Sequence, residues 1–298
     1  MAFRALVLGA AAGGGLPQWN CGCLNCSLAR QGKIKSSTQS SVAFTGDGVN
    51  WSVFNASPDI RIQLIRARPL YPTGLRDVPL SSVVLTNGDI DHVAGLLTLR
   101  EQQRFELFAT QGIHDVLNEN PIFDALRPET VPRTPIALDT PFSPSPGLMT
   151  ELFAVPGKVP LYLEGETVET ELVGEQTVGV ELTAAGKTAH YIPGCAKMDD
   201  ALRDRLRGSD VVFFDGTLWT DDEMQREGVG QKTGKRMGHM SMSGPEGSIA
   251  AFAGLEVGQK VFVHMNNTNP VWRPDSQERA EAEAASWIIA EDGMEIAP

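Results

Sequence analysis

Short apolar runs recur along the whole chain and are separated by polar, turn-forming segments. Runs of this length that are rich in β-branched and aromatic residues are typical of buried strands. They predict strands at Phe3–Leu8, Ser41–Phe44, Trp51–Asn55, Val83–Thr86, Arg104–Ala109, Leu148–Val155, Val178–Thr183, Thr188–Pro193, Val211–Phe214 and Val261–His264.

Helical patterns lie between several of these strands. In Asp59–Arg68, the residues Ile60, Leu64 and Ile65 fall on one helical face. Strands interspersed with helices in this way predict an α/β or α+β fold built of layered sheets. The other predicted helices are His92–Arg100, Asp199–Arg207, Pro245–Gly254 and Ser276–Ile289.

Proline is concentrated in residues 120–147, which hold seven of the 19 prolines. Because proline lacks a backbone donor and disfavours regular elements, we expect a long surface excursion there, not a linker between domains. A length of 298 residues suits one large domain or two small ones. We predict a single domain over residues 1–298.

Charge and cysteine content limit the expected partners and the expected cellular compartment. The formal net charge of -12 at pH 7 argues against nucleic acid as a partner, since phosphate binding needs clustered cations. No apolar run approaches the about 20 residues of a membrane-spanning helix, so no membrane span is expected. The four cysteines are too few for a disulfide framework and favour a reducing compartment, the cytoplasm.

Three of the cysteines lie together in the loop 20–26. Cys21, Cys23 and Cys26 form a C-x-C-x-x-C pattern, and closely spaced thiolates bind Zn²⁺ as a tetrahedron. The loop is therefore predicted to hold a structural zinc ion that contributes to the free energy of folding. The fourth ligand stays open between Cys195, a histidine, and the oxygen of an asparagine near the C-terminus.

The turn after the predicted strand Val83–Thr86 is the most informative stretch. Its residues 87–92 carry two carboxylates and an imidazole, and a helix begins at once. Turns at strand ends gather such groups in a cleft. From spacing alone two interpretations stand level: Asp89 or Asp91 caps the helix while His92 packs in the core, or the three side chains form a functional site.

The same turn resembles the H-x-H-x-D-H signature of the metallo-β-lactamase superfamily, with Asn87, Asp89, Asp91 and His92 at its four key positions. The resemblance covers residues 1–298 and implies a four-layer αβ/βα sandwich. Other segments resemble the superfamily in the same order along the chain: Ala154–Lys158, Tyr191–Ala196, Phe213–Thr217, Gly238–Ser241, Val261–His264 and Asp292–Met294.

Three unusual segments narrow the resemblance further. They are the start Pro17–Cys26, the Asn-x-Asp-x-Asp-His variant at residues 87–92, and His264–Pro270. Together they are similar to the B-protein family of coenzyme PQQ (pyrroloquinoline quinone) biosynthesis. That resemblance implies an iron-dependent oxygenase that uses O₂ to hydroxylate the tyrosine-derived ring of a small cross-linked Glu–Tyr precursor.

Departures from the superfamily pattern change the expected metal content. A complete superfamily site holds two metals about 3.5–4 Å apart, and three histidines hold one of them. Those three positions are here Asn87, Asp89 and Lys158. A protonated lysine repels a cation and asparagine is a poor ligand for Zn²⁺, so we expect no metal at this first position.

The second metal position keeps a complete set of ligands, Asp91, His92 and His264. Two neutral imidazoles and one carboxylate suit a single Fe(II) with open coordination sites. The same three side chains also accept Zn²⁺, so ligand identity does not decide the metal.

The resemblance also places an acid–histidine pair, Asp215 and His239, beside the metal. Asp215 is expected to orient His239, a candidate general acid/base or contact to the substrate phenol; direct ligation of the metal by Asp215 stays open. Asp89 is a further candidate ligand or proton acceptor. Lys158 is expected to bind a substrate carboxylate or to pair with Asp89 or Asp91.

Three functional hypotheses follow. The first is the iron-dependent hydroxylase of PQQ biosynthesis. The second is a Zn²⁺-dependent metallohydrolase of the phosphodiesterase type, and the third is a non-catalytic carrier of PQQ or its precursor. His114, predicted on an exposed helix, and His190, predicted inside a strand, are expected to take no part. The sequence leaves the electron source and the oligomeric state open, with a homodimer as one option.

Overall fold

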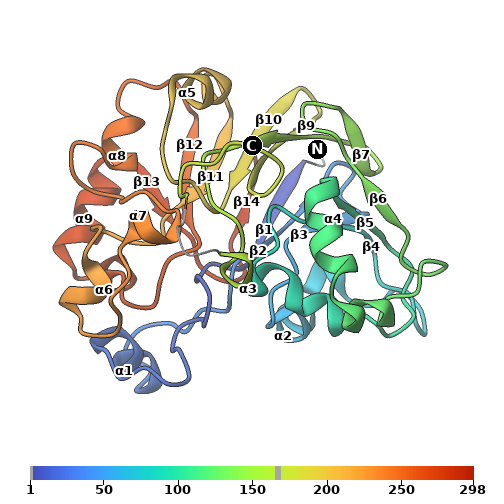
Figure 1. Ribbon diagram of the computed structural model, residues 1–298, viewed down its shortest axis with the longest axis horizontal. Helices are drawn as coiled ribbons and strands as arrows, with labels where there is room; N and C mark the ends of the chain where they lie inside the picture. Colours follow the sequence, from blue (N-terminus) through green and yellow to red (C-terminus); the bar gives the residue numbers. More distant parts are fainter. Residues whose placement is uncertain (1–2, 165–168) are drawn as a thin grey trace.

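The computed structural model describes residues 3–164 and 169–298, and two mixed sheets dominate this part of the chain (Figure 1). In the first sheet β1, β2, β3 and β14 pair antiparallel and β3 to β6 run parallel. Its strands, in spatial order, are β14 Glu295–Ile296, β1 Arg4–Gly9, β2 Ser41–Thr45, β3 Trp51–Phe54, β4 Leu80–Val84, β5 Glu106–Ala109 and β6 Arg133–Pro135.

The second sheet is formed by the later half of the chain. Here β10 to β13 run parallel, while β7 to β10 are joined antiparallel. Its strands, in spatial order, are β13 Trp287–Ile289, β12 Gln259–Val263, β11 Val211–Asp215, β10 Lys187–Ile192, β9 Val178–Ala184, β8 Leu148–Ala154 and β7 Phe142–Ser145.

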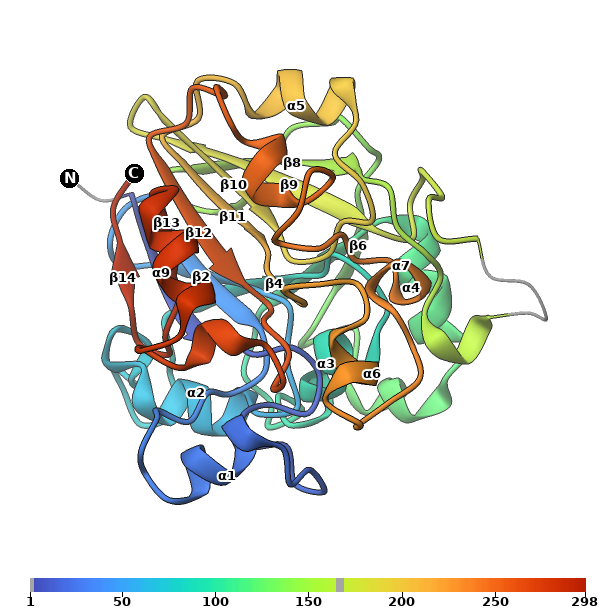
Figure 2. The same cartoon turned by 90° about the vertical axis from the view of Figure 1, so that its left-hand side faces the viewer.

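Helices cover the outer face of each sheet, and the two halves of the chain lie side by side (Figures 1 and 2). The helices are α1 Leu24–Arg30, α2 Ile60–Arg66, α3 Ile90–Val93, α4 Gln111–Asn118, α5 Asp200–Leu206, α6 Glu223–Arg226, α7 Gly234–Met237, α8 Ser248–Ala251 and α9 Gln277–Ala284. Short 3₁₀ turns occupy Arg68–Leu70, Ala94–Leu97, Pro121–Ala125, Leu161–Leu163 and Pro270–Trp272.

The core between the two sheets is aromatic. Phe44 of the first sheet meets Phe213 of the second edge-on, with ring centroids 5.5 Å apart, and both are fully buried. Phe54 and Tyr191 pack on the same cluster. Edge-to-face contacts of this kind add to the stability that burial of apolar area provides. The predicted αβ/βα sandwich is confirmed.

Two expectations about individual elements are wrong. The helix predicted over Ser276–Ile289 ends at Ala284, and Trp287–Ile289 forms strand β13 beside β12. The ring of Trp287 stacks on Phe262 at 3.7 Å, a contact that only the strand conformation provides. The proline-rich stretch 120–147 is not purely irregular, since it contributes β6 and β7, which lie at sheet edges, where proline is tolerated.

In the described part of the chain, none of the helices is both long and apolar enough to cross a membrane. The longest, α4 and α9, have eight residues each. That is far below the about 20 residues that such a span needs.

Candidate metal centre

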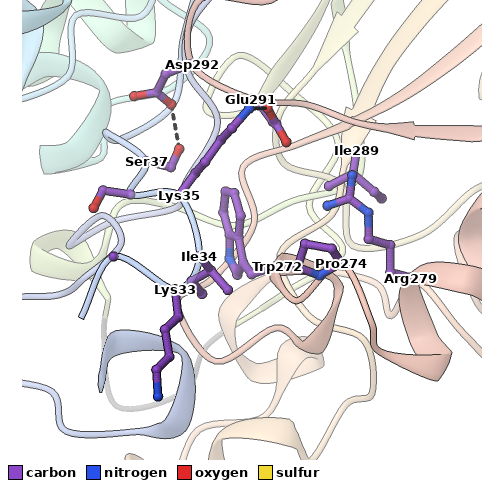
Figure 3. A pocket seen from close by; sticks show the side chains of 12 residues that line it. Lys33, Ile34, Lys35, Ser37, Trp272, Pro274, Arg279, Ile289, Glu291 and Asp292 are labelled. Atoms are coloured by element: carbon purple, nitrogen blue, oxygen red, sulfur yellow. Dashed lines mark hydrogen bonds and ion pairs between the residues drawn. The ribbon is translucent and has the colours of Figure 1, made fainter. Parts of the chain in front are cut away.

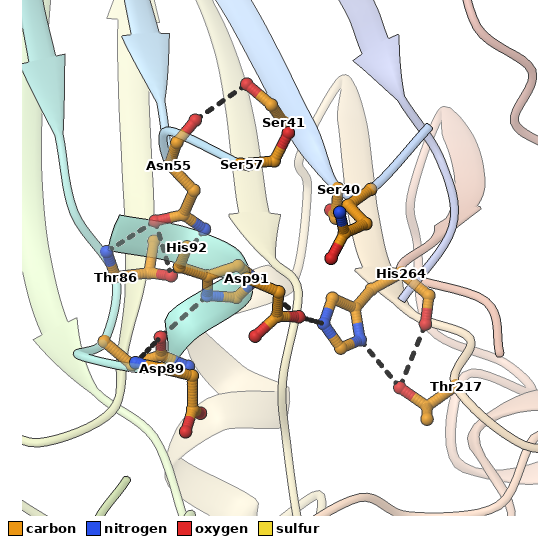
Figure 4. A network of polar contacts seen from close by, with 12 residues as sticks. Ser40, Ser41, Asn55, Ser57, Thr86, Asp89, Asp91, His92, Thr217 and His264 are labelled. Carbon is orange, nitrogen blue, oxygen red and sulfur yellow. Dashed lines mark hydrogen bonds and ion pairs between the residues drawn. The ribbon is translucent and has the colours of Figure 1, made fainter. Parts of the chain in front are cut away.

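The candidate ligands lie where the parallel strands of both sheets end. A turn connects strand β4 to α3, which carries Asp91 and His92, and β12 ends one residue before His264. Figure 4 shows Asp91 between the rings of His92 and His264. The sandwich thus brings together side chains that lie more than 170 residues apart, as the contact between His264 and Asp91 shows.

The ligand atoms of Asp91, His92 and His264 all lie within 4.8 Å of one another. Asp91 Oδ2 is 3.2 Å from His264 Nε2 and 4.0 Å from His92 Nε2. His92 is buried, and its Nε2 has no hydrogen-bond partner among residues 3–164 and 169–298. A buried polar atom without a partner is costly, and a metal ion would satisfy it. The three side chains therefore fit a metal.

The two imidazoles differ in their protonation. Burial lowers the pKa of His92 to about 4, so this ring is neutral. Burial also acts on His264, but the hydrogen bond and charge of Asp91 raise its pKa above the ordinary value. His264 Nε2 and Asp91 Oδ2 lie 3.2 Å apart, within hydrogen-bond distance. A metal ion would replace the proton on His264 Nε2.

The backbone at His264 is strained. Its φ is +57°, in the left-handed region that non-glycine residues rarely adopt. The residue follows β12 directly, and this turn of the backbone accompanies the approach of its ring to Asp91 and Thr217. Strain held in place by its surroundings is common at functional sites.

Asp215 is fully buried at the end of β11 and accepts four hydrogen bonds. Oδ1 accepts from the backbone N–H (3.0 Å) and hydroxyl (2.6 Å) of Thr217, and Oδ2 accepts from Cys195 N–H (3.0 Å) and His239 Nδ1 (2.7 Å). Although burial opposes ionisation, His239 and its hydrogen bond hold the pKa of Asp215 below its ordinary value. Its acceptor sites are occupied, which favours orientation of His239 over direct ligation of a metal.

Thr217 is a site residue that sequence reasoning missed. Its hydroxyl lies 2.9 Å from His264 Nδ1 and 2.6 Å from Asp215 Oδ1. Because the carboxylate accepts the hydroxyl proton, the oxygen accepts Nδ1–H of His264 and fixes that ring. Partners of this kind set the orientation of metal-ligating histidines. The signal in the sequence is a hydroxyl residue two positions after a buried strand-end aspartate.

Asp89 and Lys158 lie at the mouth of the centre. Burial and the charge of Asp91 raise the pKa of Asp89. Lys158 forms an ion pair with Glu164 (3.0 Å), which also binds Arg236 (2.8 Å). The expectation that Lys158 pairs with Asp89 or Asp91 is therefore wrong. The hydrogen bond from Arg236, followed by that from Lys158, lowers the pKa of Glu164 to about 2.

The three clustered cysteines form a second candidate metal site. The sulfurs of Cys21, Cys23 and Cys26 lie within 4.8 Å of one another. The side-chain amide of Asn267 lies 3.3 to 3.5 Å from all three sulfurs. Cys195 does not belong to this group among the described residues; its thiol is buried and donates to the Lys197 carbonyl. Of the expected fourth ligands, Asn267 is the one that lies beside the sulfurs, with its amide nitrogen donating to them, and ligation of a metal by its oxygen stays a prediction.

The two remaining histidines lie outside both candidate sites. His114 is buried, not exposed as expected, and its Nε2 lies 3.2 Å from the Thr134 carbonyl oxygen. His190 lies in β10 and contacts Ser209 and Glu181. His114 thereby links α4 to β6, and His190 links β10 to β9.

Asp292, in the segment that resembles the superfamily's C-terminus, has a structural role. Its carboxylate accepts hydrogen bonds from the hydroxyls of Ser37 (2.6 Å) and Thr38 (2.8 Å) and from Ala10 N–H (3.2 Å). Figure 3 shows it at the rim of a cavity of about 280 Å³ beside Lys35. These bonds hold the start of the loop after β1, and Gly13 of this loop lies against Asp91.

Glu223, at the start of α6, is buried beside the loop that follows His264. Its carboxylate accepts hydrogen bonds from Trp219 N–H (2.6 Å) and the Thr268 hydroxyl (2.5 Å). Burial raises its pKa to about 7. The residue thereby joins α6 to the segment that carries Asn267.

This carboxyl gives a testable pH dependence. Between about 4.5 and about 7, the folded protein keeps a proton that the unfolded chain has released, so the free energy of unfolding should fall as pH rises. The loss for this group is about 3 kcal/mol. Urea unfolding at a series of pH values measures it, and Glu223→Gln should flatten this part of the profile. An unchanged slope in the variant would show that Glu223 does not cause the loss.

Comparison with known proteins first identifies the superfamily to which the chain belongs. The model of the beta-lactamase superfamily domain matches residues 50–265, and the chain belongs to this superfamily. A diphosphatase of the PhnP family has a TM-score of 0.70 at 21% identity, covering 99% of this chain and 97% of its own. At that identity the likeness shows the shared fold alone.

Two relatives and one crystal structure identify the family within this superfamily. Coenzyme PQQ synthesis protein B from Ruegeria pomeroyi is 59% identical and covers 99% of both chains. The same protein from Rhizobium meliloti is 55% identical and covers 99% of this chain and 97% of its own. The chain belongs to the coenzyme PQQ synthesis protein B family. The structure of Zn²⁺-bound PqqB from Methylobacterium extorquens is 51% identical, with a TM-score of 0.97, and covers 99% of this chain and 100% of its own.

Proposed function

We propose that this protein is an iron-dependent oxygenase of PQQ biosynthesis that hydroxylates the tyrosine-derived ring of a cross-linked Glu–Tyr precursor. The family membership supports the pathway. The observation that supports the chemistry is the set of two imidazoles and one carboxylate, Asp91, His92 and His264. An adjoining group, Asp215, His239 and His264, shares one of these imidazoles. The first set suits Fe(II) with open coordination sites, and Fe(II) held there would supply the activation of O₂.

The surroundings of this set favour one metal over two. The side-chain oxygen of Asn87 already accepts two hydrogen bonds, from Asp89 N–H and from His92 Nδ1. The positive charge of Lys158 acts on Asp89 and partly offsets the rise in the pKa of that carboxyl. Neither residue is placed to hold a second cation, and hydrolysis by a hydroxide shared between two metals is thereby disfavoured.

The other residues of the cleft handle the substrate and its protons. Asp215 accepts Nδ1–H of His239, which leaves His239 Nε2 available to accept the proton of the substrate phenol. Asp89, with its raised pKa, is a second proton acceptor. Lys158 is proposed to bind a carboxylate of the precursor while Glu164 and Arg236 hold it at the mouth.

The overall reaction requires an external reductant. One oxygen atom of O₂ enters the ring as a hydroxyl group and the other leaves as water. Two electrons therefore come from a reducing agent, such as an enediol or a reduced flavin, in addition to the two removed from the C–H bond. The structure leaves the identity of that donor open.

Oxygen incorporation tests the proposal directly. Protein loaded anaerobically with Fe(II) and exposed to ¹⁸O₂, ascorbate and a synthetic cross-linked Glu–Tyr compound should yield a product that contains one ¹⁸O atom, read by mass spectrometry. Zinc-loaded protein is the matched control. His239→Gln should lower the rate about 10²-fold or more, because general acid–base groups contribute typically 10²–10⁴-fold. Absence of labelled product with stoichiometric iron would contradict the proposal.

One observation favours a second candidate, a Zn²⁺-dependent phosphodiesterase. The short contact between Asp215 and His239, 2.7 Å, matches the acid–histidine pair that the sequence resemblance associates with that branch. Hydrolysis of a cyclic phosphodiester by the zinc-loaded protein would support it. PQQ production that persists in a His92→Ala, His264→Ala double variant would instead support the carrier hypothesis.

We also infer that zinc at Cys21, Cys23 and Cys26 has a structural role. Asn267 is the proposed fourth ligand, because its amide carries an oxygen and lies beside all three sulfurs. The backbone N–H of Cys23 and neighbouring side chains lower the pKa of Cys21 against the effect of burial. A thiolate favoured at Cys21 suits Zn²⁺, whereas burial raises the pKa of Cys26 to about 12, so a metal ion would have to displace the proton of that thiol.

A further inference from the structure

Asn87 lies next to the candidate metal centre, at the end of the turn that follows β4. It is buried, and its side-chain oxygen is 2.7 Å from His92 Nδ1. The same oxygen is 3.1 Å from the backbone N–H of Asp89. Asn87 stands where the superfamily signature has its first histidine, but it faces His92 and not a metal.

These two contacts determine where the protons lie. A backbone N–H can only donate, so the Asn87 atom that faces Asp89 must be the oxygen and not the amide nitrogen. This oxygen can only accept. His92 Nδ1 faces the same oxygen and must therefore carry the proton of the neutral ring. The lone pair of His92 is then on Nε2, the buried atom without a hydrogen-bond partner in the described residues.

We propose that Asn87 is a positioning residue of the metal centre: it holds His92 in the Nδ1–H tautomer with Nε2 ready to bind the metal. The inference rests on the metal site of the proposed function and extends it by one residue. An outer partner that fixes the tautomer and orientation of a ligating histidine strengthens metal binding by about 10- to 100-fold.

The partner of His92 differs in kind from those of His264 and His190. His264 Nδ1 faces a hydroxyl, that of Thr217, which acts as acceptor because its own proton goes to the Asp215 carboxylate or the His264 carbonyl. His190 Nδ1 also faces a hydroxyl, that of Ser209, and a hydroxyl can donate or accept. At His92 the partner is an amide oxygen, whose orientation the N–H of Asp89 fixes, and this oxygen excludes the other tautomer.

The tautomer is measured by long-range ¹H–¹⁵N NMR on metal-free protein labelled at the histidine nitrogens. We expect the His92 signals of a neutral ring protonated at Nδ1 in the wild type and in Asn87→Asp, whose carboxylate oxygen accepts the same hydrogen bonds. In Asn87→Leu, which cannot accept them, the Nε2–H form should appear. A wild-type His92 protonated at Nε2 would overturn the inference without any variant.

The affinity for Co(II), measured by competition with a chelator, provides the second readout. Asn87→Leu should bind Co(II) about 10- to 100-fold more weakly, while Asn87→Asp restores wild-type affinity or exceeds it. Asn118→Ala is the matched control. It removes an asparagine of α4 that accepts a hydrogen bond from Arg133, and it should leave the affinity for Co(II) unchanged. Equal affinities in wild type and Asn87→Leu would refute the role of Asn87.

A third variant separates this inference from the metal site itself. Asp91→Ala should lose Co(II) binding whatever the role of Asn87. If Asp91→Ala binds Co(II) as the wild type does, the proposed metal site is wrong. If Asp91→Ala loses binding while Asn87→Leu keeps it, the metal site stands and only the inference about Asn87 fails.

Discussion

Asp91→Ala is expected to weaken Fe(II) binding at the histidine centre by more than about 100-fold. Asp91 is the carboxylate of the three-residue set and lies between both imidazoles. Its loss leaves two neutral ligands, and loss of an outer-shell partner alone already costs about 10- to 100-fold. Anaerobic competition with a chelator measures the affinity, and iron analysis of the purified protein measures the occupancy.

The fold should survive this substitution. Asp91 is partly exposed at the cleft, so its removal opens no apolar cavity, and far-UV circular dichroism should match the wild type. Asp204→Ala, which removes a carboxylate with 75% of its side chain exposed, is the control and should leave the iron content unchanged. Unchanged iron stoichiometry in Asp91→Ala would contradict the ligand assignment.

Cys23→Ser is expected to cause the largest loss of stability. Zinc bound by the three thiolates contributes directly to the free energy of folding. The loop is also tied to the distant segment after β12, since Asn25 donates to the carbonyls of Asn267 and Asn269. Losing the metal should release both segments and lower the free energy of unfolding by more than about 2 kcal/mol, with zinc content falling in parallel.

Two comparisons isolate the effect of zinc from that of the mutation. Cys195→Ser alters a buried thiol outside the cluster and should leave zinc content unchanged. After removal of zinc by a chelator, wild type and Cys23→Ser should unfold at nearly the same denaturant concentration. A persistent difference between the zinc-free proteins would show that Cys23 stabilises the fold through packing and not through metal.

Local pattern was enough to predict most of the strands. The run Val211–Phe214 is buried on both faces in the second sheet, so it is continuously apolar. In Val178–Thr183 the buried apolar residues alternate with half-buried Glu181 and Thr183, a pattern that is typical of a strand with one polar face. The strand at Trp287–Ile289 was missed because its three residues follow a helix directly. Its conformation depends on pairing with β12 and on stacking against Phe262, which are contacts between distant parts of the chain.

The site was predictable to the extent that it follows from residue type and position at strand ends. Asp91, His92 and His264 carry groups that bind metals, and the resemblance gave their order. The roles of Asn87 and Thr217 were not predictable, because each depends on which ring nitrogen a side chain faces. The exclusion of Cys195 from the zinc cluster likewise depends on distances that only the folded chain sets.

The central claim is that the cleft holds a single metal ion, bound by Asp91, His92 and His264. Anomalous diffraction at the iron edge, from crystals of protein loaded with Fe(II) without oxygen, tests it most directly. The account predicts one iron peak among these three side chains, and at the zinc edge a separate peak at Cys21, Cys23 and Cys26. Two metal peaks about 4 Å apart in the cleft, or an iron peak away from both imidazoles, would contradict it.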